Sequence, residues 1–122
     1  MADNRDVLER VTLAIAGLIG ATGVASAAAA SHMGESRNLA AIAAICLAHG
    51  PALLALGLAG RGRLLTVAAV LLGLGTVIFV GDLAVREWLG HGAFPGAAPL
   101  GGVGMIGGWL MIVFAALVWR RR

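Results

Sequence analysis

The residue in this sequence best suited to chemistry is His49, which lies near the middle of an apolar run and is followed by Pro51. Proline has no backbone N–H, so it leaves the carbonyl of Leu47 without its helical donor and tends to kink a helix. A histidine beside such a carbonyl is a candidate site for a proton, an ion or a small ligand. The alternative is structural: neutral His49 hydrogen-bonds Thr22, Thr76 or a backbone carbonyl and holds helices together.

A second polar group is formed by Asp82 and Arg86, which are four residues apart with the acidic residue first. This order favours an ion pair on one helix face, and an interfacial pair is one interpretation. The other is a polar vestibule completed by Glu87, His91 and His32. These three are ligand-type residues, but their spacing matches no known metal-binding pattern, so no metal site is predicted.

Three further patterns do not predict chemistry. Gly102, Gly104 and Gly107 have the spacing of a dinucleotide-binding loop, but that motif functions only between a strand and a helix. Here the glycines belong to an apolar span. Cys46 is the only cysteine and lies in an apolar run, which predicts an inert buried thiol. No serine has a nucleophile-elbow context. We therefore expect neither an enzyme nor a bound cofactor.

Composition assigns the chain to the membrane. Of its 122 residues, 60% are hydrophobic and 12% charged, and the mean hydropathy is +0.94. A soluble domain has about 25% charged residues, so this chain lacks the polar surface of a water-soluble globule. Its nine basic residues are all arginines near the ends of apolar runs. This distribution predicts topology anchors and excludes a nucleic-acid surface.

The apolar runs predict four membrane-spanning helices. They cover approximately residues 11–30, 39–59, 64–85 and 100–119. About 20 residues cross a hydrocarbon core of about 30 Å, and backbone polar groups in lipid are satisfied within a helix. Short connections make consecutive helices antiparallel neighbours. The expected fold is all-α, a membrane four-helix bundle that forms a single domain over residues 1–122.

Arginine distribution predicts the orientation. With the amino terminus inside, seven arginines lie on the cytoplasmic side and only Arg37 and Arg86 lie on the other. Both termini are therefore expected in the cytoplasm, with the chain in a bacterial-type inner (plasma) membrane. Acidic residues before the first span argue against a cleaved signal peptide. The seven inner arginines are Arg5, Arg10, Arg61, Arg63, Arg120, Arg121 and Arg122.

Small residues mark the expected helix contacts. Lipid is as apolar as leucine, so membrane helices associate through close backbone approach and hydrogen bonds. We expect the first and fourth helices to be deeply engaged, and their stripes to pack within the chain or, in addition, against a second copy or a larger partner. The predicted packing residues are Gly17, Ala21 and Ala25 in the first helix, and Gly101, Gly102, Gly104, Gly108 and Trp109 in the fourth.

Three elements resemble the domain-of-unknown-function 423 family, small membrane proteins that include transmembrane protein 256. They are the Pro-x-Gly-Gly…Gly-Trp pattern of residues 99–109, the histidine-led run 49–58 and the Leu-Gly-x-x-x-Phe-x-Gly-x-Leu pattern of residues 74–83. The resemblance spans about residues 12–119. It implies a four-helix membrane protein without an agreed activity. The Phe and His common late in the family's first helix are missing from residues 24–29.

Two functions follow as hypotheses. The first is a structural or accessory membrane protein that packs in a larger assembly, such as a supernumerary subunit of a bioenergetic complex, or associates with itself. Its partners would be the lipid bilayer and other membrane proteins or a second copy. The second is a small channel or carrier with a midplane site at His49 and Pro51, which requires a hydrated path to His49.

Overall fold

The computed structural model describes residues 3–34 and 36–120, and the regular structure of those residues is entirely helical. All four helices are long and apolar enough to cross a membrane, as multi-pass membrane proteins require. The predicted all-α architecture with four such helices is confirmed. The helices are α1 (Asn4–His32), α2 (Arg37–Ala59), α3 (Arg63–Leu89) and α4 (Ala97–Leu117).

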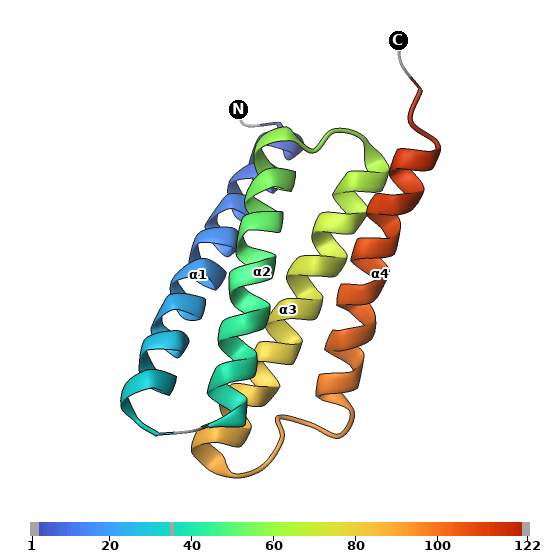
Figure 1. Cartoon of the computed structure of the whole chain (residues 1–122). Coiled ribbons are helices and arrows are strands. Elements are labelled where there is room, and N and C mark those ends of the chain that lie inside the picture. Colours follow the sequence, from blue (N-terminus) through green and yellow to red (C-terminus); the bar gives the residue numbers. More distant parts are fainter. Residues whose placement is uncertain (1–2, 35, 121–122) are drawn as a thin grey trace.

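The helices lie side by side in the order of the sequence (Figure 1). The closest pairs are α1 with α2 and α3 with α4, and α2 packs against α3. α1 makes only slight contact with α3, and no Cα atoms of α1 and α4 lie within 8 Å in the described chain. The first and fourth helices are thus each engaged with one neighbour, not with each other. In Figure 1 the α2–α3 connection lies at the same end as the start of α1 and the end of α4.

Two helix ends differ from the predicted spans. α1 begins at Asn4, because the charged residues before the first span contain no helix breaker and Asp6 is favourable in a first turn. The α3–α4 connection begins at Gly90 and ends at Gly96, with φ of 76° and 83°. Glycine adopts this left-handed conformation without steric cost. Arg121 and Arg122 of the predicted cytoplasmic anchor lie outside the described residues.

α1 and α2 meet through small residues. A Cβ atom added to Gly50 would lie 3.2 Å from the Cα atom of Gly20, so the two backbones are nearly in contact. A Cβ atom on Gly23 would lie 3.0 Å from the side chain of Cys46. The buried residues of α1 are Thr12, Ala16, Ile19, Gly23 and Ser26.

The predicted stripe of α1 lies on a different face. Gly17, Ala21 and Ala25 are all exposed, and a Cβ atom on Gly17 would meet nothing within 4 Å. Gly17 and Ala25 each lie one position, or about 100° around the helix, from a buried residue, and Ala21 lies two positions from the nearest one. In the described chain no helix packs on this stripe, because α2 covers the neighbouring face of α1. Packing against a second chain stays a prediction.

α3 and α4 are in backbone contact. A Cβ atom on Gly101 would lie 2.7 Å from the carbonyl oxygen of Gly75, and one on Gly104 would lie 3.3 Å from the Cα atom of Gly75. A Cβ atom on Gly108 would lie 2.7 Å from the side chain of Leu72. Gly102 differs, since a Cβ atom there would meet nothing within 4 Å. Three of the four predicted glycines of this helix therefore face α3, and Gly102 does not.

The α3–α4 contact predicts a sharp difference between adjacent glycines. Gly101→Ala should lower the free energy of unfolding by about 1–3 kcal/mol, because its methyl group has to displace backbone. Gly102→Ala is the control and should be neutral or gain up to about 1 kcal/mol from helix propensity. Unfolding by sodium dodecyl sulfate, titrated into protein in mild detergent, measures both. Equal effects would contradict the described contact.

Candidate functional site

His49 is buried in α2, with 6% of its surface exposed, and both of its ring nitrogens have partners. Nδ1 lies 2.8 Å from the carbonyl oxygen of Ile45, which can only accept, so Nδ1 carries the hydrogen. Nε2 is then an acceptor, and the indole Nε1–H of Trp109 donates to it at 3.0 Å. The two rings meet edge to face, with centroids 5.7 Å apart. This geometry defines a neutral histidine with no unused ring nitrogen.

The bond between Trp109 and His49 joins helices whose backbones do not touch. In the described chain no Cα atoms of α2 and α4 lie within 8 Å of each other, so the indole reaches past α3. Neither described cavity is lined by His49. Thr22 and Thr76, the partners considered from the sequence, each donate to a carbonyl of their own helix.

Sequence reasoning assigned Trp109 to helix packing and missed it as the partner of His49. The sequence did contain a signal for this bond. His49 lies 12 residues before Arg61, and Trp109 lies 11 residues before Arg120. Both positions are therefore at a similar depth, and a buried indole N–H normally finds an acceptor. Pro51, the predicted kink, lies within α2, which continues through it to Ala59.

Asp82 is completely buried near the end of α3, where the α3–α4 connection begins. Its Oδ2 atom accepts from Nε of Arg86 at 2.8 Å, and its Oδ1 atom accepts from the backbone N–H of Ala93 at 2.8 Å. A Cβ atom on Gly92 would lie 2.9 Å from Oδ1, so the α3–α4 connection covers the carboxylate. Asp82 thus holds this connection against α3 instead of opening into a vestibule, while the Arg86 side chain is 47% exposed.

Glu87 ties the start of α2 to the end of α3. Its Oε2 atom accepts from Oγ of Ser36 at 2.7 Å and from Nδ2 of Asn38 at 3.2 Å. Oγ of Ser36 in turn accepts from the backbone N–H of Leu39 and caps α2. His32 and His91 are exposed. In residues 3–34 and 36–120, no three His, Cys, Asp or Glu side chains gather as a metal site would require.

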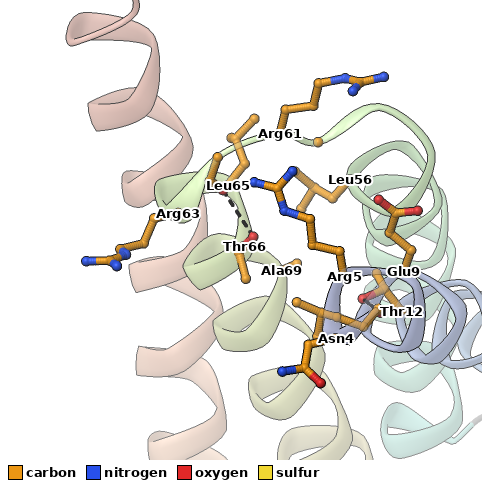
Figure 2. Close-up of a pocket in the computed structure, with 14 residues that line it drawn as sticks. Asn4, Arg5, Glu9, Thr12, Leu56, Arg61, Arg63, Leu65, Thr66 and Ala69 are labelled. Carbon is orange, nitrogen blue, oxygen red and sulfur yellow. Dashed lines mark hydrogen bonds between the residues drawn. The ribbon is translucent and has the colours of Figure 1, made fainter. Parts of the chain in front are cut away.

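A cleft of about 410 Å³ opens at the end of the bundle where α1 begins (Figure 2). Its walls are residues 4–12 of α1, the last turn of α2, the α2–α3 connection and residues 63–69 of α3. The arginines among its lining residues are Arg5, Arg61 and Arg63. The sequence indicated these arginines only as topology anchors. They share a cavity because the folded chain places the start of α1 near the start of α3. Counting charges along the sequence does not reveal this placement.

Fold and site together define a small four-helix membrane protein whose buried His49 and Asp82 are hydrogen-bonded to other side chains of the chain. Residues 16–102 match the family described as "Protein of unknown function (DUF423)", and the chain belongs to this family. The match confirms the resemblance seen in the sequence. It contains all of α2 and α3 and stops before Gly104, Gly108 and Trp109. No curated protein and no solved structure matches the chain.

The His49–Trp109 bond predicts a measurable coupling between α2 and α4. Trp109→Phe should destabilise the protein by about 0.6–1.7 kcal/mol, because the buried Nε2 acceptor loses its donor. A double-mutant cycle with His49→Leu should return a coupling free energy of the same size. Trp88→Phe is the control, since Trp88 is 68% exposed. Additive effects of the two substitutions would contradict the bond.

The burial of Asp82 predicts a local effect on the α3–α4 connection. Asp82→Asn should cost about 1–3 kcal/mol, because the charge-assisted bond to Arg86 is replaced by two opposed donors. Hydrogen exchange at the Ala93 amide should become faster. Asp6→Asn removes the same charge from an exposed position on α1 and should leave exchange at Ala93 unchanged. Unaltered exchange in the Asp82 variant would contradict the role described here.

Proposed function

We propose that this chain is a structural or accessory membrane protein and not an enzyme. In this proposal the bundle associates with a further transmembrane helix, which belongs to a second copy or to a larger membrane assembly. The observation that carries the proposal is the exposed face of α1 formed by Gly17, Ala21 and Ala25, which we call the outer α1 stripe.

The chain's own contacts support this role for the outer α1 stripe. Where small residues of this chain face another helix, the backbones come close enough that a Cβ atom would collide, as at Gly75 and Gly101. The outer α1 stripe has the four-residue spacing of Gly104 and Gly108, but no helix of the described chain lies against it. Membrane helices associate through such surfaces because close backbone approach gains dispersion contacts that lipid does not offer.

The polar side chains support the same proposal. His49, Asp82 and Glu87 are all engaged in bonds that connect one element of the fold to another. Every buried side-chain nitrogen or oxygen in the described part of the chain has a hydrogen-bond partner. The alternative function, a channel or carrier using His49, requires a ring nitrogen open to a hydrated path. The two bonds of His49 favour the structural role.

We further propose that both termini face the cytoplasm, in a bacterial-type inner membrane. The support is the grouping of arginines by end of the bundle, since cytoplasmic ends of membrane proteins are enriched in Lys and Arg. Arg37 and Arg86 belong to the opposite end. The arginines at the end that contains the start of α1 include Arg5, Arg10, Arg61, Arg63 and Arg120.

The association can be tested by placing bulk on the stripe. Wild-type protein extracted in mild detergent should migrate on native gels as an assembly larger than one chain. The double variant Gly17→Leu/Ala21→Leu should shift to the size of a single chain, because leucine side chains block close approach.

Gly102→Leu is the matched control for this experiment, since it also adds a leucine where nothing lies within 4 Å but on α4. It should leave the assembly intact. Helix content by circular dichroism should be the same in all three proteins. A strictly monomeric wild-type protein with no co-purifying partner would refute the proposal.

A further inference from the structure

We propose that the crevice between α1 and α3 is a binding site for one anionic phospholipid. The phosphate would lie between Arg5 and Arg61, and one acyl chain would follow the crevice into the bundle. This inference does not depend on the association through the outer α1 stripe, which lies outside the residues that line the crevice.

The crevice exists because α1 and α3 lie on either side of α2 with only slight contact between them. It consists of the terminal cleft of about 410 Å³ and an apolar groove of about 210 Å³. Leu8, Thr12 and Ala69 line both, so the two cavities are continuous. A molecule that occupies both needs a polar end and a long apolar part.

The groove has the chemistry and the length of an acyl-chain site. Every residue that lines it is uncharged, and Thr12 is the only one with a polar side chain, which donates to the carbonyl of Leu8. Along α3 the crevice extends from Arg63 to Val77, which is about 21 Å of helix, and the hydrocarbon core is about 30 Å thick. Since the third span begins near residue 64, the groove extends past the bilayer midplane. Its floor and walls include Ile15, Leu53, Val70, Leu74 and Val77.

The mouth of the crevice is positively charged. Three arginines and one acidic residue, Glu9, line the cleft. Figure 2 shows the side chain of Arg5 extending across the cleft toward Leu65, with Arg61 at the rim and the guanidinium of Arg63 turned away from the cleft. The ion pair found in the described chain is Asp82–Arg86, which leaves the guanidiniums of Arg5 and Arg61 available to an anion.

The start of α3 adds to the preference of the cleft for an anion. Gly62 and Arg63 line the cleft, so the amino-terminal end of the helix, with its unsatisfied N–H groups, opens on the same space. This end of a helix carries a partial positive charge and favours phosphate. A guanidinium donates two parallel hydrogen bonds to phosphate oxygens. A zwitterionic lipid would add a quaternary ammonium beside the arginines, which the same charges repel.

Native mass spectrometry of the full-length protein in mild detergent tests the site directly. With phosphatidylglycerol and phosphatidylcholine of identical acyl chains, wild-type protein should retain one phosphatidylglycerol in clear preference. Arg5→Gln and Arg61→Gln should each weaken phosphatidylglycerol binding about fivefold, the contribution of one arginine near an anionic lipid surface. Arg37→Gln makes the same change in net charge at the opposite end and should have no effect.

A second pair of variants tests the groove. A side chain at Gly73 would enter it, and a Cβ atom there has room, its nearest neighbour being a methyl carbon of Leu53 at 3.9 Å. Gly73→Leu should therefore reduce binding of both lipids. Gly81→Leu, on the same helix but with nothing within 4 Å, should reduce neither.

Three outcomes would overturn the proposal. The first is equal retention of phosphatidylglycerol and phosphatidylcholine by wild-type protein. The second is an effect of Arg37→Gln as large as that of Arg61→Gln, which would mean that only net charge matters. The third is displacement of the lipid by a hundredfold excess of inorganic phosphate, which would assign the arginines to a soluble anion. Circular dichroism of each variant verifies that the helices are retained.

Discussion

The distance of closest approach between helix backbones is the constraint on which the rest of this structure depends. In a bilayer, leucine gains little by leaving lipid for a neighbouring helix, so contacts between helices rely on dispersion at short range and on hydrogen bonds. The chain meets this requirement with glycine where helices cross, at Gly20 and Gly50 for α1 and α2 and at Gly75 and Gly101 for α3 and α4. These crossings set the spacing of the helices, and the spacing determines which polar side chains can reach one another.

The polar side chains then connect elements that glycine alone does not join. Trp109 and His49 link α4 to α2, Asp82 links α3 to the connection that follows it, and Glu87 links α3 to the start of α2. Each bond is buried or partly buried, where a lost partner costs more than in water. These groups already have partners within the chain, so the proposed contacts with other helices and with lipid lie on the outer surface and in the crevice.

Much of the fold follows from the sequence, because the length of an apolar run and the position of charged residues are one-dimensional signals. All four helices were predicted, and the Asp82–Arg86 pair followed from its four-residue spacing. The face of α1 that packs inward was not predictable in the same way. Gly17, Ala21 and Ala25 form as regular a stripe as the buried set around Ala16 and Gly23, and only the shape of α2 decides between them. The Trp109–His49 bond and the arginine-lined cleft likewise depend on how separate helices are placed.

The Trp109–His49 bond also connects two parts of the molecule, the α1–α2 hairpin and the α3–α4 hairpin. α1 with α2 and α3 with α4 are the closest pairs, so the chain consists of two helical hairpins, each with extensive contacts of its own. The indole of Trp109 belongs to the second hairpin and the imidazole of His49 to the first, so their bond requires both. The hydrogen bond of the Trp109 indole is therefore complete only when both hairpins are packed together.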